Sequence, residues 1–473
     1  MTNAHSNANS NANSNETASG VYSTKIQEQI DQLFSTILTE QQKINKIKAA
    51  DPDKVNFFKS KLDYYIKNRG REFFYNYISS GKGHGPFTEL LDGSVKYDLI
   101  NGIGFNLLGH SHPLMIKANL EAATVDTVMC GNLQTYVDAN EASVALVNSV
   151  KEKSRLKHFW FTGSGGCAND LALKLIWQKK APKYNLIAFK KAFAGRTIAT
   201  QEITDKPDFR EGMPKYLNVF HVPHFDQKNP TTSLYNTLSA LDDLWERFPE
   251  TFSAMMIELI QGEAGFIYGD KAFYEGIFKW AKEKGIYVWV DEVQTFGRTK
   301  ELFAFQMFGL DQYVDMVTIA KAAHICGALY TEELNPKPGL IAGTFNGSIS
   351  SIKMGSKIIN YLLKGNFYGE NGRIAELEKK FLNKMQKVQD SVGQDKLKFF
   401  SGIGTMISFE VRDGNKKVTT NFAKKLFENG VISFTAGQDP ARIRFLLPLS
   451  LTDENIDEIF TILEKTFKED LWN

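Results

Sequence analysis

Residues 286–298 read IYVWVDEVQTFGR, and the fold class is most clearly indicated here. Residues 286–290 form an apolar and aromatic run without a polar interruption, and two acids, Asp291 and Glu292, follow it at once. Such a run of β-forming residues is typical of a strand in a parallel sheet that is covered on both faces. A carboxylate at the end of a buried strand is costly unless it is paired or hydrogen-bonded. Asp291 therefore has either a structural partner or a positively charged ligand.

Apolar runs of the same kind recur through the middle of the chain, with helix-period segments between them. Strand–helix alternation predicts an α/β domain whose mostly parallel sheet carries helices on both faces. We place this large domain at residues 95–350. The predicted strands are residues 158–161, 185–189, 217–222, 253–259, 286–290 and 315–320, and the predicted helices include 168–180, 234–248 and 271–284.

The remaining segments complete the predicted domain organisation. Residues 1–20 are a polar Asn/Ser/Ala tract with nothing to bury, so we predict a disordered tail. Residues 21–94 are predicted to be a mostly helical segment that joins the small domain and a dimer interface. Residues 351–393 carry a long helical pattern, and shorter strands and helices follow it. That mixture predicts a smaller C-terminal α+β domain over residues 351–473.

Composition excludes several classes of protein. Of the 473 residues, 42% are hydrophobic and 23% charged, as is usual for a soluble protein of two domains. The net charge of +2 gives no reason to expect nucleic acid or an anionic membrane as a partner. Cys130, Cys167 and Cys326 have no zinc spacing, which favours a reducing compartment and no metal site. Because no apolar run reaches the length of a membrane span and no signal-peptide core is present, we expect a cytoplasmic protein.

Two of the predicted strands are followed by turns that suit an anion or a flat ligand, as expected at the carboxyl edge of an open sheet. Gly165 and Gly166 stand in a turn that opens a helix, and free N–H groups there suit a phosphate. An ordinary tight turn is the equal alternative, because the P-loop lysine and the dinucleotide spacing are missing. Phe193 and Arg196 flank another glycine, where they could stack on a ring and bind a carboxylate, or simply form a surface loop.

Charged residues follow three further strands. Glu258 and Glu263 stand at the end of one, Asp291 and Gln294 after the next, and Lys321 after the last. A single lysine in that position is usually solvated. One ligand nevertheless needs the lysine, the buried acid, the aromatic side chain and the phosphate cradle together, namely pyridoxal 5′-phosphate.

In this order the motifs resemble those of the class III pyridoxal-phosphate aminotransferases, which include acetylornithine, ornithine, 4-aminobutyrate and lysine ε-aminotransferases. The resemblance implies a type I fold, in which a large domain with a mostly parallel mixed sheet is joined by a small α+β domain from both ends of the chain. It also implies a homodimer. The matching segments are GIGFNLLGHSHP (102–113), SGGCAND (164–170), FAGRT (193–197), IELIQGEAG (257–265), DEVQTFGRT (291–299), TIAKA (318–322), GTFNG (343–347) and IRFLLPL (443–449).

The resemblance implies a role for each matching residue toward the cofactor. Lys321 would be the catalytic Schiff-base lysine, and Asp291 the catalytic acid that pairs with the ring nitrogen. Gln294 would hydrogen-bond the ring hydroxyl, and Phe193 would stack on the ring. The phosphate would be held by Gly165, Gly166 and, across the dimer, Thr344 of the partner subunit.

The same resemblance implies the substrates. Arg444 would bind the α-carboxylate of glutamate or 2-oxoglutarate, and Arg196 the second carboxylate. Glu263 would neutralise Arg444 when the amine donor lacks that carboxylate, while Glu292 is expected to be structural. The implied reaction moves an amino group from an ω-amine or amino acid donor to 2-oxoglutarate in a ping-pong cycle.

The chain also departs from the family pattern around the substrate cleft. Gly163, Gly166 and Cys167 stand where Asn, Thr and Glu are usual, Ala194 replaces His or Trp, and residues 322–327 read AAHICG in place of a Gly-rich turn. These departures leave the amine donor open. They also keep two alternatives open: an aminomutase, racemase or decarboxylase of the same fold, and a non-catalytic dimer that retains it.

Overall fold

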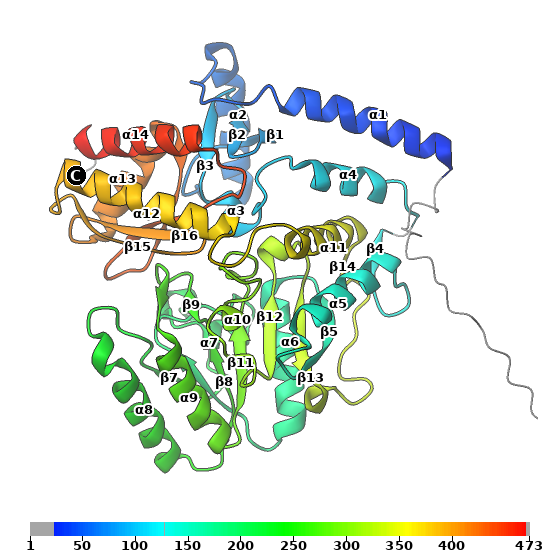
Figure 1. Cartoon of the computed structure of the whole chain (residues 1–473), viewed down its shortest axis with the longest axis vertical. Coiled ribbons are helices and arrows are strands. Elements are labelled where there is room, and N and C mark those ends of the chain that lie inside the picture. The colour runs from blue at the N-terminus through cyan, green and yellow to red at the C-terminus, as the bar shows by residue number, and fades with distance from the viewer. Residues whose placement is uncertain (1–22, 127, 470–473) are drawn as a thin grey trace, which may run out of the picture.

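The computed structural model describes residues 23–126 and 128–469, which form a large domain and a smaller one beside it (Figure 1). The predicted disordered tail at residues 1–20 lies outside the described residues. Within the described ranges, no helix is both long and apolar enough to cross a membrane.

The large domain is built on a seven-stranded sheet with the order β5-β13-β12-β11-β8-β6-β7. Six strands run parallel, and β13 is antiparallel to both of its neighbours, so the predicted mixed sheet is confirmed. All six predicted strands are present, whereas the sequence analysis missed β13. The strands are β5 (Leu156–Thr162), β6 (Asn185–Phe189), β7 (Val219–Val222), β8 (Phe252–Ile257), β11 (Tyr287–Asp291), β12 (Met316–Ile319) and β13 (Cys326–Thr331).

Both faces of this sheet are apolar, which explains the unbroken hydrophobic run in β11. Val288 and Val290 belong to the core on one face, and Trp289 between them belongs to the core on the other. Trp289 is fully buried, and its ring N–H donates to Thr318 Oγ1 over 3.2 Å, so its polar atom is satisfied. Successive side chains of a strand point to opposite faces, so only a sheet covered twice accepts this pattern.

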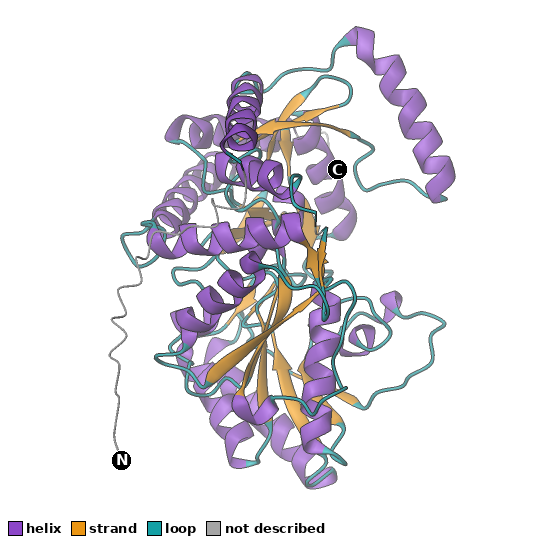
Figure 2. Cartoon of the chain, turned by 90° about the vertical axis from the view of Figure 1, so that its right-hand side faces the viewer, coloured by secondary structure: helices purple, strands orange, loops and turns teal. Residues whose placement is uncertain are grey.

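Helices cover both faces of the sheet, and Figure 2 shows them around the central strands. Leu175 of α6 (Gly165–Lys180) lies in the core that contains Trp289, and Ile277 of α9 (Lys271–Glu283) lies in the opposite core. Helix α6 begins at Gly165, three residues before the predicted start at residue 168, because Ser164 caps it by accepting from Cys167 N over 3.2 Å. The other large-domain helices are α4 (Pro113–Ala122), α5 (Val137–Val150), α7 (Thr200–Ile203), α8 (Pro230–Arg247), α10 (Ala304–Met307) and α11 (Ile349–Lys364).

The smaller domain combines both ends of the chain, as the fold class predicted. Its first sheet has the order β1-β2-β3-β17, so N-terminal strands pair with a C-terminal one. Its second sheet, β15-β16-β19-β18, is antiparallel, and α12 to α14 lie on this domain in Figure 1. The bounds are β1 (Ser79–His84), β2 (Phe87–Leu90), β3 (Val95–Asp98), β15 (Leu397–Ile403), β16 (Met406–Val411), β17 (Val431–Ile432), β18 (Phe434–Ala436), β19 (Arg442–Leu446), α12 (Arg373–Val392), α13 (Lys416–Glu428) and α14 (Asp453–Glu469).

Two segments differ from the sequence-based expectation. The N-terminal segment is helical in α1 (Thr24–Gln41) and α2 (Pro52–Arg69) but ends in the strands β1 and β2. The long helical pattern at 351–393 is two helices, because glycines at 365, 369 and 372 interrupt it. The first of them, α11, packs against α4 and α5, which places it on the large domain. The remaining short elements are α3 (Asn101–Gly104), β4 (Met129–Cys130), β9 (Ile260–Gln261), β10 (Ile267–Tyr268) and β14 (Gly347–Ser348).

Candidate active site

A cavity of about 380 Å³ opens where the parallel strands end. It lies beyond the carboxyl ends of β5, β6, β8, β11 and β12, the edge at which open α/β sheets bind ligands. The predicted site residues that line it are Gly165, Gly166, Phe193, Glu263, Asp291, Gln294 and Lys321.

Asp291 lies buried at the end of β11, and its carboxylate faces this cavity. Asn169 Nδ2 donates to Asp291 Oδ2 over 2.8 Å, and Val293 N donates to Asp291 Oδ1 over 2.8 Å. Burial nevertheless raises the pKa of Asp291, because these two donors do not replace its lost hydration. A cationic group in the cavity would restore the charged form. The adjacent acid, Glu292, is hydrogen-bonded within the protein and has a structural role, since it accepts from Thr295 Oγ1 and Phe305 N.

A second carboxylate, Glu258, lies beside Asp291. Ile257 of β8 pairs with Val290 of β11, so the residues that follow the two strands are neighbours. Burial, and then the charge of Asp291, raise the pKa of Glu258 to about 8. Its oxygens accept from Phe193 N over 2.8 Å and from Gly262 N over 3.1 Å. Glu258 thus holds two loops that form the cavity wall.

Lys321 enters the cavity from a strained backbone position. It follows β12, begins the short 3₁₀ turn Lys321–Ala323 and has φ +49°, which is unusual for a residue with a side chain. Burial lowers the pKa of Lys321 to about 8, and the charges of Glu263, Arg444 and Asp291 act on it as well. A lysine in this state is partly neutral near pH 8, as a nucleophile or a general base requires.

The turn before α6 forms a cradle for an anion. Gly165 and Gly166 open a helix of 16 residues, so their backbone N–H groups point along its positive end. A side chain at Gly165 would lie 3.1 Å from Val293 Cγ1 and 3.2 Å from Ala320 Cβ, and one at Gly166 would lie 3.3 Å from Thr197 Cγ2. Glycine therefore lets the backbone approach the cavity closely.

The side chain of Gln294 presents an unpaired hydrogen-bond acceptor at the cavity. Its Oε1 is buried and has no hydrogen-bond partner among the described residues. A side chain at Gly262 would lie 2.0 Å from this oxygen, so the glycine makes room for it. Buried polar atoms are normally satisfied, so this oxygen is free to accept from a donor such as the hydroxyl of a ligand in the cavity. An anion cradle, a buried acid, a partly neutral lysine and this oxygen together fit pyridoxal 5′-phosphate.

An ion pair closes one side of the cavity. Arg444 Nη2 donates to Glu263 Oε1 over 2.7 Å, and Arg444 Nη1 donates to Gly262 O over 3.1 Å. Arg444 is fully buried and sits on β19 of the smaller domain. Burial alone would raise the pKa of Glu263, yet the charge of Arg444 and its hydrogen bond hold that pKa below its usual value. The predicted partners are thus in contact.

Arg196 lies outside the residues that line the cavity. It is exposed, and its guanidinium carbon stands 3.7 Å from the ring centre of Phe209. Lys206 approaches the same ring, with Nζ at 4.9 Å. Burial lowers the pKa of Lys206, on which the charges of Glu263, Arg444 and Arg196 also act. Phe209 therefore carries two cations close to the Glu263–Arg444 pair.

Thr344 is also away from the cavity of its own chain. It is exposed on a segment that runs along residues 130–132, where Asn132 N donates to Gly343 O over 3.0 Å and Asn346 N donates to Cys130 O over 2.8 Å. Its predicted contact with a phosphate in the partner subunit stays a prediction.

The structure adds three residues that the sequence analysis did not assign: Asn169, Glu258 and Lys206. Asn169 stands four residues after Gly165 on the same helix face, a spacing that could have indicated it. Glu258 ends a strand as Asp291 does, which was a visible signal. No feature of the sequence indicated Lys206, because only the fold brings it near Arg444. Among the described residues, no group of three or more His, Cys, Asp and Glu side chains is placed to bind a metal.

Comparisons with known proteins agree with this geometry. The sequence profile of the family Aminotransferase class-III matches residues 66–467. The acetylornithine aminotransferase of Caldanaerobacter subterraneus subsp. tengcongensis is 28% identical over 399 residues, 82% of this chain and 94% of that protein. A probable 4-aminobutyrate aminotransferase of Bacillus subtilis is 28% identical over 415 residues, 81% and 91% respectively. A solved lysine aminotransferase from M. tuberculosis shares the fold, with a TM-score of 0.75 at 18% identity over 86% of this chain and 98% of that chain.

Proposed function

The chain belongs to the class III aminotransferases, which are pyridoxal-phosphate enzymes, and on that premise we propose that it transfers an amino group from an ω-amine or amino acid donor to 2-oxoglutarate in two half-reactions. One observation carries the proposal: the Glu263–Arg444 pair stands at the cavity that Lys321 and Asp291 line. A single site of this kind suits two substrates that differ by one carboxylate.

The cofactor, when bound, supplies a ring that accepts electrons from the carbon next to the substrate amine. We assign the cradle of Gly165 and Gly166 to its phosphate, Asp291 to its ring nitrogen, Gln294 to its ring hydroxyl and Phe193 to its face. The buried carboxylate of Asp291, held by Asn169, supports this assignment, because a charged acid there keeps a proton on a facing nitrogen.

Lys321 is the proposed acid–base group. Its ammonium is desolvated, so its pKa lies near 8 and the neutral amine is populated at working pH. Lys321 has a left-handed backbone and lines the cavity, and no described carboxylate lies within ion-pair distance of its Nζ. The lysine can therefore accept a proton from a substrate carbon and return it to another atom.

The substrate carboxylates are assigned to three cations. Arg444 presents a guanidinium that suits one carboxylate in a two-pronged contact. Arg196 and Lys206, both against Phe209, would receive the second carboxylate of glutamate or 2-oxoglutarate. When a donor brings its amine without an adjacent carboxylate, Glu263 would stay paired with Arg444. A counter-ion is needed then, because a buried charge without a partner costs several kcal/mol.

We also propose that the active form is a homodimer. Thr344 and Phe345 are exposed, and Val128 and Leu133 are exposed on the neighbouring segment. A group of exposed apolar side chains of this kind is typical of a protein interface. The proposal would place Thr344 of the partner subunit at the phosphate.

A donor screen tests the function. Cofactor-saturated enzyme is incubated with 2-oxoglutarate and a panel of ω-amino acids, α-amino acids and simple amines, and glutamate is quantified. We expect glutamate from at least one ω-amine donor and none from Lys321→Ala. Pyruvate in place of 2-oxoglutarate is the control for acceptor choice, since it lacks the second carboxylate. Alanine formation without any glutamate formation would reject 2-oxoglutarate as the acceptor.

A further inference from the structure

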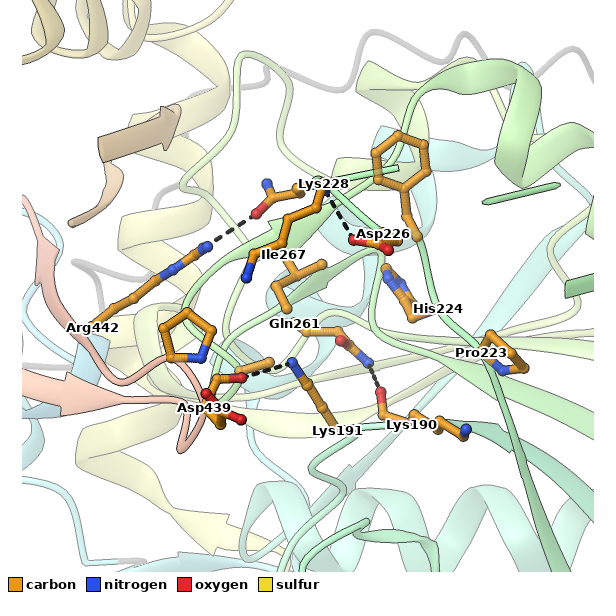
Figure 3. A pocket seen from close by; sticks show the side chains of 14 residues that line it. Lys190, Lys191, Pro223, His224, Asp226, Lys228, Gln261, Ile267, Asp439 and Arg442 are labelled. Carbon is orange, nitrogen blue, oxygen red and sulfur yellow. Dashed lines mark hydrogen bonds between the residues drawn. The ribbon is translucent and has the colours of Figure 1, made fainter. Parts of the chain in front are cut away.

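A second cavity, of about 250 Å³, lies where the large and small domains meet (Figure 3). Its walls come from the ends of β6 and β7, from the β9–β10 segment and from the turn before β19. The β9–β10 segment separates it from the active site, because Gln261 and Ala264 line the second cavity while Gly262 and Glu263 line the first.

Cations dominate one end of this second cavity. In Figure 3 the ammonium groups of Lys191 and Lys228 point toward the space beside Arg442, whereas Lys190 points away. Arg442 is neutralised, since its Nε and Nη2 donate to Glu410 Oε1 over 3.1 and 2.9 Å. Among residues 23–126 and 128–469, neither lysine has a carboxylate within ion-pair distance. Within the same ranges, the hydrogen bond of the Lys191 ammonium goes to a backbone carbonyl, that of Asp439, over 3.5 Å.

The acids of this cavity do not cancel those two charges. Asp226 is used to shape its own turn, where it accepts from Lys228 N and from Asn229 Nδ2, each over 2.9 Å. Asp439 is exposed at the rim. Lys191 is exposed, yet partial burial of its ammonium, and then the charge of Arg442, lower its pKa. The charges of Asp439 and Asp226 act in the opposite direction without offsetting this lowering, so neither acid serves as a full counter-ion. A bound anion would supply that counter-ion.

The wall of this cavity is connected to the Glu263 switch. Arg442 Nη1 donates to Gly265 O over 3.0 Å, and Gly437 N donates to Glu263 O over 2.8 Å. Two residues further along the same strand, Arg444 makes the ion pair with Glu263. The loop that carries Glu263 is therefore held by β19 and by the turn before it, and that turn also lines the second cavity.

We propose that the second cavity is a regulatory site for a phosphate group, either free or carried on a small metabolite. A dianion would neutralise Lys191 and Lys228 of the large domain and bind beside the turn 437–442 of the small domain. Occupancy would then hold this turn, and with it the Glu263–Arg444 pair, in the arrangement seen here. Binding itself is independent of the proposed transamination, whereas its effect on the two half-reactions rests on it.

Calorimetric titration of cofactor-saturated enzyme tests binding without any substrate. Inorganic phosphate and glycerol 3-phosphate are the two probes, and tighter binding of the second would identify a phosphate ester as the ligand. In Lys191→Gln/Lys228→Gln we expect affinity to fall at least tenfold, because two charge-assisted contacts are lost. The matched control, Lys174→Gln/Lys215→Gln, removes two exposed lysines outside the cavity and should bind as the unaltered enzyme does.

Three results would overturn the site: no heat with either probe, equal affinity in the Lys191/Lys228 variant, or an equal loss in the control. If the double variant fails to fold, Lys228→Gln alone decides, since this side chain is exposed. Single-turnover rates then test regulation. Phosphate should raise the ratio of the amine half-reaction rate to the glutamate half-reaction rate, and only in proteins that bind it. Binding with an unchanged ratio would refute regulation but not the site.

Discussion

Arg444 and Glu263 are in direct contact, with Nη2 and Oε1 2.7 Å apart, although they stand 181 positions apart in the chain. Arg444 is fully buried, and Glu263 is its only carboxylate partner among the described residues. The pair joins the smaller domain to the loop that borders Lys321. Any substrate carboxylate that reaches Arg444 must replace Glu263, so this contact is the expected point of substrate discrimination.

Replacing Glu263 with Gln should affect the two half-reactions in opposite directions. The substitution keeps the size and removes the counter-ion, so an amine donor would face an unpaired Arg444. We expect the amine half-reaction to slow about tenfold or more, and the glutamate half-reaction to be unchanged or faster. Arg444→Gln should instead raise the KM for 2-oxoglutarate by about tenfold to a hundredfold. Single-turnover spectroscopy separates these effects, with Glu283→Gln on the exposed face of α9 as control. Equal slowing of both half-reactions by either variant would refute the switch.

Asp291→Asn should abolish most of the activity while the cofactor stays bound. The substitution preserves shape but removes the charge that holds a proton on the ring nitrogen, so turnover should fall by orders of magnitude. Asn169→Ala should give a smaller loss, of about tenfold, because Asp291 keeps its bond from Val293 N. Cofactor content by absorbance and turnover by glutamate release distinguish the two variants. Near-normal turnover of Asp291→Asn would make Asp291 a structural acid.

Lys206→Gln and Arg196→Gln should weaken binding of substrates with two carboxylates and spare those with one. Each cation lies against Phe209. The proposed hydrogen bond from each cation to the second carboxylate of the substrate is charge-assisted and worth about 1.5–3 kcal/mol. The KM for 2-oxoglutarate should therefore rise about tenfold or more in each variant, while the KM for pyruvate should not. An equal rise in the KM for both acceptors would show that the two residues have a structural role and do not bind the second carboxylate.

Glu258 should make the cofactor-free protein less stable as the pH rises. Burial, and then the Asp291 charge, raise its pKa from 4.5 to about 8, so between these values the folded state binds more protons than the unfolded chain. The free energy of unfolding then falls with rising pH across this window, by an amount on the order of a few kcal/mol. Glu258→Gln, which is neutral throughout, should flatten the decline of Tm from about pH 5 to pH 8. Glu283→Gln should leave the decline unchanged, and identical slopes in all three proteins would contradict the prediction.

Leu133→Asp should dissociate the proposed dimer. Leu133 is fully exposed in the single chain, so the substitution costs the monomer little, whereas a charge inside an apolar interface is costly. Sedimentation velocity should show monomers of low activity. Thr344→Ala should instead leave the dimer intact and weaken cofactor binding, measured by dialysis. A fully active Leu133→Asp monomer would show that each site is complete within one chain.

Much of the fold was readable from the sequence because it depends on local patterns. The run at 286–290 has to be a strand buried on both faces, since both Val288 and Trp289 need apolar neighbours. Gly165 marks a helix opening because a side chain there would crowd the side chains of Val293 and Ala320. The order of motifs along the chain was enough to identify the family and the cofactor. The strand β13 was missed because it follows the lysine turn directly, without the helix that separates the other strands.

The arrangement of charges was decided by the tertiary structure alone. Asn169 donates to Asp291 from 122 positions earlier in the chain. Burial, and then the charge of Asp291 at the end of the adjacent strand, raise the pKa of Glu258. The fold also brings Lys206 to the ring of Phe209, where Arg196 lies too. It places Arg196 outside the residues that line the cavity. The local sequence indicates which secondary structure a residue favours and whether its side chain is buried. Which charge faces which depends on sheet order and on the chain crossings between strands, and electrostatic energy depends on those distances.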